Sequence, residues 1–391
     1  MAAFKVSENV YWVGVNDWAL KDFHGLYVPR GGSYNSYLIL GEKKALIDTV
    51  YKRFTGDFIR KISEVTPLEE IDYVVANHSE VDHSSSLPEV LKAAPRAKVV
   101  TNKKCQAMLQ RLFGIPSNRF FPVKNGDKLS LGNFTLQFIE QPMVHWPETM
   151  FTYLMEEKVL FPCDFLGTQM AASPLLVEDT SDFTADSRAY YTFIMRPFNE
   201  QVLKGVHKVR ELSPQIVAPS HGPVLKGTAV EQILKKYEIW STSPETRKVV
   251  IPYVSLWGGT GRMAELIAEG VELAGVPVKV MNLTSTPMSE VISEALEAKF
   301  LAVGSPTLVK GIHPLISAFL VFLEMIKPGN KKGMVFGTFG WNGNAGKITH
   351  EMMEKMGVRM VEDPLLLYLT PTPEDCLLLI EKGKTIAAAL E

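Results

Sequence analysis

Alternation of apolar and polar residues predicts strands through the first part of the chain. Three short apolar runs, 10–15, 34–40 and 44–50, are separated by turn residues, and their close spacing predicts an antiparallel start. Further on, the pattern predicts helices at 55–65, 87–94 and 228–240, and strands at 71–76, 98–101, 134–138, 151–154, 158–161 and 215–218. This half of the chain is therefore expected to mix antiparallel and parallel strands.

The pattern changes after a polar segment at 241–248 that contains a proline. Continuous apolar strands then alternate with helices, which is typical of a parallel sheet covered on both faces. The predicted strands are 249–254, 278–283, 300–303 and 333–337, and the predicted helices are 262–274, 289–298 and 314–326. Since 391 residues exceed what one core usually supports, we predict two domains, 1–245 and 246–391.

Composition and charge exclude several classes of protein. The chain has 41 basic and 43 acidic residues and no basic run interleaved with aromatics, so nucleic acid is not an expected partner. Its N-terminus does not read as a signal peptide, and its most apolar helical segment, 314–326, is too short to span a bilayer. Without a spanning helix, no membrane association is expected. Three scattered cysteines without a C-x-x-C pair favour a reducing, cytoplasmic location.

Side chains that can bind metal ions are concentrated directly after the strand predicted at 71–76. They are His78, Glu80, Asp82 and His83. Three more candidates, His145, Asp164 and His221, each follow another predicted strand. A lone histidine is more often structural than ligating, but the ends of strands are where α/β proteins place their chemistry. The repeated placement predicts one site for two metal ions.

These seven residues resemble the metal ligands of the metallo-β-lactamase superfamily, whose usual motif is H-x-H-x-D-H. Here Glu80 replaces the second histidine, which is similar to the H-x-E-x-D-H motif of flavodiiron proteins, also called A-type flavoproteins. The resemblance covers the whole chain, because that family continues into a flavodoxin-like domain. It implies a fold that combines α/β and α+β parts, with an N-terminal metallo-β-lactamase-like αβ/βα sandwich and a C-terminal flavodoxin-like, doubly wound parallel sheet.

The resemblance also implies a ligand set for two non-haem iron ions. His78, Glu80 and His145 would bind one iron, Asp82, His83 and His221 the other, and Asp164 would bridge them. A carboxylate in place of an imidazole favours a harder, more oxidised metal, so we expect iron rather than zinc.

Two further stretches resemble family positions near the di-iron pocket. The first is Asp22-Phe-His24-Gly. His24 is expected either to lie beside the metal ligands or in the substrate pocket, or to be structural, and we weigh these two roles equally. In the pair Tyr190-Tyr191, one hydroxyl is expected to line the pocket, and we assign this role to Tyr191, with plain packing as the alternative.

Three glycine-bracketed loops at successive strand ends predict a phosphate and flavin site in the second domain. Hydroxyls, backbone N–H groups and a helix N-terminus form a phosphate cradle after 249–254. No G-x-G-x-x-G follows a strand, which favours FMN over a dinucleotide. The predicted FMN-binding residues are Ser255, Leu256, Trp257, Gly258, Gly259, Thr260, Pro306, Thr307, Leu308, Val309, Thr338, Phe339, Gly340, Trp341, Asn342 and Gly343.

The resemblance implies an oxidoreductase that reduces O₂ to water, NO to N₂O, or both. The chain lacks rubredoxin-like cysteine pairs, so its electron donor would be a separate rubredoxin or a reduced deazaflavin such as coenzyme F420. Family resemblance further implies a head-to-tail homodimer or a dimer of dimers. Two alternatives remain open from the residues: a zinc hydrolase fused to a flavodoxin, and an electron carrier whose first domain serves only for docking.

Overall fold

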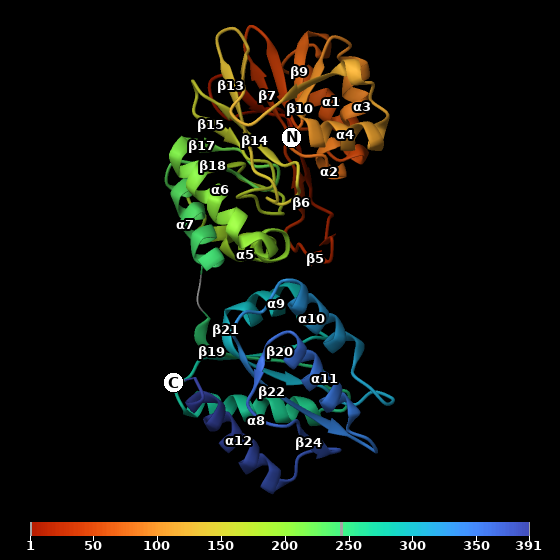
Figure 1. Cartoon of the computed structure of the whole chain (residues 1–391), viewed down its shortest axis with the longest axis vertical. Coiled ribbons are helices and arrows are strands. Elements are labelled where there is room, and N and C mark those ends of the chain that lie inside the picture. The colour runs from red at the N-terminus through yellow and green to blue at the C-terminus, as the bar shows by residue number, and fades with distance from the viewer. Residues whose placement is uncertain (1, 243–244, 391) are drawn as a thin grey trace. The chain divides into compact units, whose positions relative to one another are not determined.

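The computed structural model describes residues 2–242 and 245–390, which form two compact units, Met1–Thr242 and Ser243–Glu391 (Figure 1). The division falls within the polar segment where we predict the domain boundary. Ser243 and Pro244, which belong to that segment, lie outside the described residues.

Two sheets pack face to face in the first unit (Figure 1). Their strands run in the orders β1-β2-β7-β8-β9-β10-β11 and β12-β13-β14-β15-β17-β18-β16. The core between them contains large aromatic side chains from both sheets, such as Tyr37 and Phe161, whose ring centroids lie 5.3 Å apart. The strands of the first sheet are β1 (Phe4–Lys5), β2 (Val10–Trp12), β7 (Tyr37–Leu40), β8 (Lys44–Ile47), β9 (Ile71–Val75), β10 (Lys98–Asn102) and β11 (Phe120–Val123). Those of the second are β12 (Lys128–Ser130), β13 (Thr135–Glu140), β14 (Met150–Leu154), β15 (Val159–Phe161), β16 (Leu176–Val177), β17 (Ile216–Val217) and β18 (Val224–Lys226).

Helices cover the outer face of each sheet, which gives the αβ/βα sandwich expected from the family resemblance. The helices on the first sheet pack against it through the buried side chains of Phe58, Val90 and Leu109. Those on the second sheet do so through Val206 and Ile233. The helices on the first sheet are α1 (Thr55–Ser63), α3 (Leu87–Ala93) and α4 (Lys103–Phe113); those on the second are α5 (Thr184–Tyr190), α6 (Asn199–Leu212) and α7 (Thr228–Thr242). We assign no element from the sequence to 166–212, where α5 and α6 lie.

Two predicted strands are each divided in the structure. Residues 10–15 form β2 and β3 (Val15–Asp17), and residues 34–40 form β6 (Gly32–Tyr34) and β7. A Cβ on Gly14 would lie 2.5 Å from the carbonyl oxygen of Tyr34, so only glycine allows the two segments to approach this closely. Next to this contact, β3 and β6 form a small antiparallel sheet of their own. A second hairpin, β4 (Asp22–Phe23) and β5 (Leu26–Tyr27), follows β3.

The second unit is a doubly wound parallel sheet, as predicted. Its strands run in the order β20-β19-β21-β22-β23, with β24 also pairing with β22, and all these pairs are parallel. Helices α8 and α12 pack together on one face through Met263, Ile267 and Leu379, and Figure 1 shows the sheet between them and α9–α11. The elements are β19 (Thr246–Tyr253), α8 (Gly259–Leu273), β20 (Val278–Asn282), α9 (Met288–Glu297), β21 (Ala298–Gly304), α10 (Pro314–Met325), β22 (Lys332–Phe339), α11 (Asn344–Lys355), β23 (Arg359–Met360), β24 (Leu365–Tyr368) and α12 (Pro373–Ala388).

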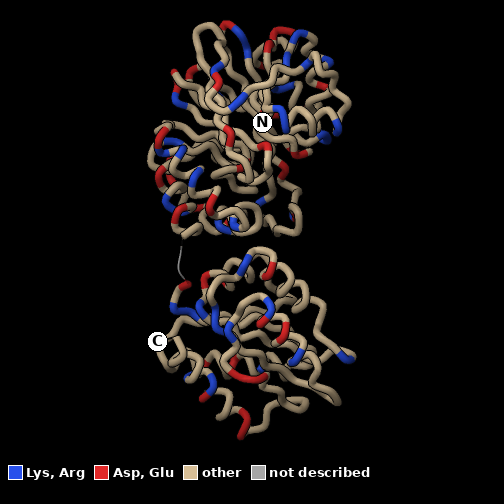
Figure 2. Tube along the Cα trace, viewed as in Figure 1, with Lys and Arg blue, Asp and Glu red and all other residues tan. Residues whose placement is uncertain are grey.

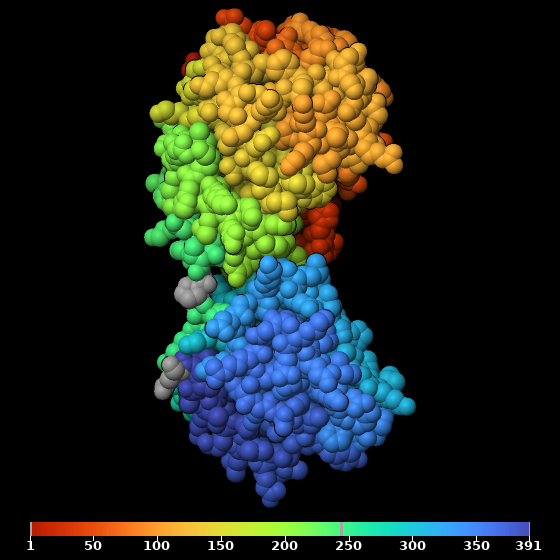
Figure 3. Space-filling view, in the orientation of Figure 1, coloured from red at the N-terminus to blue at the C-terminus, as the bar shows by residue number. Residues whose placement is uncertain are grey.

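Basic and acidic residues are interspersed along the trace of each unit (Figure 2). On the face of the first unit drawn in Figure 3, the orange and yellow segments, which belong to the two different sheets, lie side by side. In the described part of the chain, every helix is too short or too polar to cross a bilayer.

Candidate metal centre and cofactor pocket

The predicted metal motif lies at the carboxyl edge of parallel strands in the first sheet. Strand β9 ends before Asn77, whose backbone N–H and side-chain amide donate to the two oxygens of Asp48 at 2.7 and 3.0 Å. The Asn77 side-chain oxygen accepts from Thr152 Oγ1 at 2.7 Å, which connects the motif to the second sheet. These buried bonds fix the backbone from which His78 projects, and α2 (Val81–Ser84) carries Asp82 and His83.

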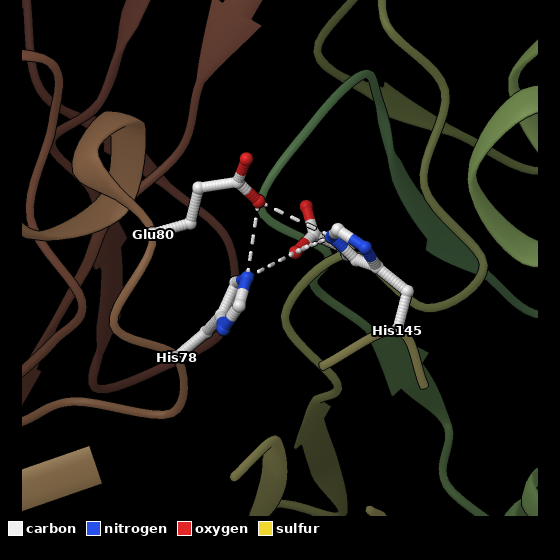
Figure 4. Close-up of side chains that lie close together, drawn as sticks. His78, Glu80 and His145 are labelled. Atoms are coloured by element: carbon white, nitrogen blue, oxygen red, sulfur yellow. Dashed lines mark hydrogen bonds and ion pairs between the residues drawn. The ribbon is translucent and has the colours of Figure 1, made fainter. Parts of the chain in front are cut away.

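The first group of candidate ligands consists of His78, Glu80, His145 and Asp164 (Figure 4). Their ligand atoms all lie within 4.8 Å of one another. Nε2 of His78 is 3.1 Å from Glu80 Oε2, and Nε2 of His145 is 3.2 Å from the same oxygen. Oδ2 of Asp164 lies 3.7 Å from His78 Nε2 and 3.6 Å from His145 Nε2.

A second group consists of Asp82, His83 and His221, which are all buried. Nε2 of His221 is 3.3 Å from Asp82 Oδ2. Oδ1 of Asp164 lies 3.0 Å from His83 Nε2 and 3.2 Å from His221 Nε2. Asp164 therefore turns one carboxylate oxygen toward each group, which is the geometry that a bridging ligand requires.

The charges of the centre are strongly coupled. Burial disfavours the charged imidazole of His78, but Glu148 and Glu80 more than offset this and raise its pKa to about 10. Burial is likewise outweighed in His221, where Asp164 and Asp82 raise the pKa to about 10. Burial would raise the pKa of Asp164, but His83 and its other histidine neighbours hold it well below its usual range.

Several atoms that could coordinate metal have no hydrogen-bond partner among the described residues. They are both carboxylate oxygens of Asp82 and Nε2 of His221, and all three are buried. Buried polar atoms without partners are costly unless they coordinate a metal ion. A set of imidazole nitrogens and carboxylate oxygens suits non-haem iron, so the residues present fit two such ions.

A cavity of about 530 Å³ occupies the predicted cofactor site of the second unit. Its wall comes from the three predicted loops and from the end of β24. The lining residues are Leu256, Trp257, Gly259, Pro306, Thr307, Leu308, Val309, Thr338, Phe339, Gly340, Trp341, Leu369 and Thr370. Leu369 and Thr370 were not predicted, because they follow a strand that carries no glycine signal.

The other predicted FMN residues do not line this cavity. Ser255 Oγ accepts from the backbone N–H groups of Gly258 and Gly261 at 3.1 Å each, so it shapes the turn into α8. Thr260 is buried and hydrogen-bonded to Thr338. Asn342 Oδ1 accepts from the N–H of Asn344 at the start of α11, next to Gly343. Ser255, Gly258, Thr260, Asn342 and Gly343 thus lie in the predicted loops but outside the lining of this cavity, and their contact with FMN stays a prediction.

Comparisons with known proteins agree with both units. The family model described as "ODP family beta lactamase" matches residues 33–222, and the flavodoxin model matches residues 251–383. The sequence is 34% identical to a nitric oxide reductase of Moorella thermoacetica, over 98% of each chain. It is 32% identical to a coenzyme F420H(2) oxidase of Methanothermobacter marburgensis, over 100% of this chain and 99% of the relative.

Solved structures extend this agreement to the whole fold. The rubredoxin oxygen:oxidoreductase of Desulfovibrio gigas matches with a TM-score of 0.94 and 34% identity, over 99% of this chain and 98% of that one. The flavodiiron protein of Giardia intestinalis matches with a TM-score of 0.93 and 29% identity, over 100% and 97%. The chain belongs to the flavodiiron protein family.

As a flavodiiron protein, the chain is an oxidoreductase whose cofactors are FMN and two non-haem iron ions. The family confirms the predicted fold class and favours the oxidoreductase over the zinc hydrolase.

His24 lies beside the metal centre of this flavodiiron protein. Its Nε2 is 3.4 Å from Glu80 Oε1, and 59% of its side chain is exposed. It lies on the β4–β5 hairpin with φ at +55°, and its ring contacts Phe23 edge to face. The hydrogen bond to Glu80 raises the pKa of His24. The sequence could not show this contact, because it depends on how the hairpin folds over the centre.

The structure corrects the prediction for Tyr191. Its hydroxyl donates to Asn199 Oδ1 at 2.6 Å and lies 2.8 Å from Ser241 Oγ, so it points away from the metal centre. Tyr190 takes the predicted place instead, because its buried hydroxyl donates to Asp164 Oδ1 at 3.1 Å. Successive residues of a helix face directions about 100° apart, so only one of the two can face the centre.

Glu148 is a buried residue at the centre that was not predicted. Its Oε1 lies 2.8 Å from His78 Nδ1 and accepts from Ser79 Oγ at 2.6 Å. It follows His145 by three positions in the loop before β14, and this proximity to a candidate ligand is the signal that could have identified it. Cys163 is also close, with Sγ 3.7 Å from Asp164 Oδ2, but burial raises the pKa of its thiol and disfavours a thiolate ligand.

Proposed function

We propose that this protein reduces O₂ to water, NO to N₂O, or both, at a di-iron centre held by the seven predicted ligands. In this assignment His78, Glu80 and His145 hold one iron, and Asp82, His83 and His221 hold the other. The observation that carries the proposal is Asp164, which directs one oxygen to each group at 3.0–3.7 Å from the imidazole nitrogens. The names of the two sequence relatives support NO reduction and an F420-type donor, and that of the D. gigas structure supports O₂ and rubredoxin.

When bound, the iron pair and FMN supply one-electron and two-electron redox chemistry that no side chain of the protein provides. The chain's own residues bind these groups and manage protons. Both reductions consume protons, and His24 Nε2 connects solvent to Glu80 over 3.4 Å. The Tyr190 hydroxyl donates a hydrogen bond to Asp164 and so orients that carboxylate. The ring of Phe23 packs edge to face against the rings of both His24 and His221, and this apolar ring restricts water beside the ligands.

We further propose a cytoplasmic head-to-tail homodimer, or a dimer of dimers, that takes electrons from rubredoxin or reduced F420. The three cysteines are free, which fits a reducing compartment. The two cofactor sites belong to separate units of the chain, so a dimer that pairs unlike units would bring them together. Membrane and nucleic acid have no part in this proposal.

Metal analysis and one substitution test the catalytic proposal. Purified protein should contain iron, and Asp164→Ala should lose iron and gas reduction while it keeps FMN. Asp182→Ala is the matched control, because Asp182 is exposed and pairs with Arg30. Chemically reduced protein is then assayed anaerobically for NO consumption and separately for O₂ consumption. About two zinc ions per chain, or gas reduction by Asp164→Ala, would overturn the proposal.

Subunit complementation tests the dimer. Asp164→Ala chains keep the flavin pocket, whereas Gly340→Trp fills the cavity that Gly340 lines and keeps the metal centre. Each variant alone should be inactive, and co-expression should restore activity in mixed dimers if the flavin of one subunit serves the irons of the other. Mixed dimers without activity would contradict the head-to-tail arrangement.

A further inference from the structure

Glu148 is a buried carboxylate that contacts a candidate metal ligand without being one itself. It is 1% exposed, and its Oε1 accepts from the N–H of Ser79 at 3.1 Å and from Ser79 Oγ at 2.6 Å. The same oxygen lies 2.8 Å from His78 Nδ1. Its Oε2 is buried and has no hydrogen-bond partner among the described residues. Every contact of this carboxylate therefore directs its charge toward His78 and the adjoining backbone.

The protonation states of this pair follow from their neighbours. Oε1 of Glu148 accepts from both the N–H and the Oγ of Ser79 and also faces His78 Nδ1, and hydrogen-bond donors gathered around one oxygen favour the ionised carboxylate. An ionised carboxylate only accepts hydrogen bonds, so Nδ1 of His78 carries the proton and Nε2 is left to bind metal. A carboxylate behind a ligating imidazole makes that imidazole a stronger donor to the metal.

The second group has no such partner on the histidines whose outer nitrogens are described. Nδ1 of His221 lies 2.5 Å from the backbone carbonyl oxygen of Ser33, which carries no net charge. Nδ1 of His83 is buried without a hydrogen-bond partner among the described residues. Among these outer nitrogens, only Nδ1 of His78 therefore has a carboxylate as its partner.

We propose that Glu148 is a positioning residue that makes the two iron sites unequal. Through the proton on His78 Nδ1, it places negative charge behind the iron held by His78, Glu80 and His145, and it favours the ferric state there. The iron of the second group lacks this charge and is reduced first. The inference rests on the ligand assignment proposed above.

Glu148→Gln tests the charge with little change of shape. The amide oxygen of glutamine can still accept from Ser79 and His78, and its NH₂ group occupies the place of Oε2. Glu140→Gln is the matched control, since Glu140 is an exposed carboxylate at the end of β13. Ser79→Ala is the opposite perturbation, because it removes the 2.6 Å donor to Glu148 and leaves more of the charge to His78.

Two measurements that do not depend on turnover decide the question. In a redox titration followed by electron paramagnetic resonance, Glu148→Gln should move one of the two one-electron steps to higher potential. Ser79→Ala should move the same step to lower potential, and Glu140→Gln should move neither. Titration of the metal-free protein with Fe²⁺ should show affinity weakened about 10- to 100-fold at one site of Glu148→Gln.

Equal shifts of both steps, or none in an iron-loaded Glu148→Gln protein, would refute the unequal-site inference. That result would leave the proposed function intact, whereas absence of iron from the unmodified protein would defeat the proposed function itself. If Glu148→Gln does not load iron, the Ser79→Ala titration decides by the direction of its shift.

Discussion

Gly270→Ala should destabilise the flavodoxin-like unit without disturbing the metal centre. Gly270 on α8 faces α12, and a Cβ placed on it would lie 2.0 Å from the carbonyl oxygen of Ile380. The approach is reciprocal, since a Cβ on Gly383 would lie 2.1 Å from the carbonyl oxygen of Ile267. Backbone atoms cannot rotate away as a side chain can, so the two helices must separate.

The magnitude follows from two opposing terms. Overpacking of a buried contact costs about 3 kcal/mol when the neighbour is backbone. Alanine returns about 1 kcal/mol of helix propensity relative to glycine. The net loss of about 2 kcal/mol should lower the melting temperature of a unit of this size by roughly 4–8 °C.

Calorimetry combined with flavin fluorescence measures this effect. The transition that releases FMN reports the second unit, and the other transition reports the first. Gly56→Ala in α1 is the control, because a Cβ there would meet no atom within 4 Å, so this change should not destabilise its own unit. If Gly270→Ala leaves the FMN-releasing transition where it is or raises it, the close packing of α8 on α12 is wrong.

Four further predictions concern the two cofactor sites. Trp257 is 98% exposed at the rim of the flavin cavity, so FMN binding should quench its fluorescence. Trp257→Ala should weaken FMN binding about 10-fold, because it removes a stacking contact worth ~1.4 kcal/mol. Unchanged affinity would show that the flavin binds elsewhere. Tyr190→Phe should alter the optical and paramagnetic spectra of the iron pair, because it removes the hydrogen bond to Asp164. Tyr191→Phe should leave these spectra unchanged and lower the free energy of unfolding by about 1 kcal/mol. The reverse pattern would contradict the placement of Tyr190 beside the centre. Fe²⁺ binding to the metal-free protein at neutral pH should release protons, because the pKa values of His78 and His221 are raised to about 10. Calorimetry in buffers of different ionisation enthalpy measures the number of protons released, and a value of zero would contradict the prediction. The protonated forms of His78 and His221 stabilise the metal-free protein fully below about pH 6.5, and this contribution is lost as the pH rises toward 10, which denaturant unfolding at several pH values would measure.

Much of the fold and of the candidate sites could be predicted from the sequence, because these features depend on residues that are close together in the chain. The alternation of apolar strands and helices after 249 predicts a parallel sheet, because strands buried on both faces need continuous apolar runs. Glycine-bracketed loops predict the flavin cavity for a similar reason, since close approach to a ligand requires residues without side chains. The metal motif is visible because four side chains that can bind metal lie within six positions directly after a strand.

Contacts between distant segments were decided only by the tertiary structure. Which of Tyr190 and Tyr191 faces the centre depends on the rotation of α5 against the second sheet, and sequence periodicity does not determine that rotation. The division of the strands at 10–15 and 34–40 needs Gly14 to meet Tyr34, two positions that are unrelated in the local pattern. Glu148 looks like any loop carboxylate until burial removes water and leaves His78 and Ser79 as its partners. The sequence by itself determined which candidate ligands and loops are present, and packing determined which other residues contact them, because hydrogen bonds and desolvation act through space rather than along the chain.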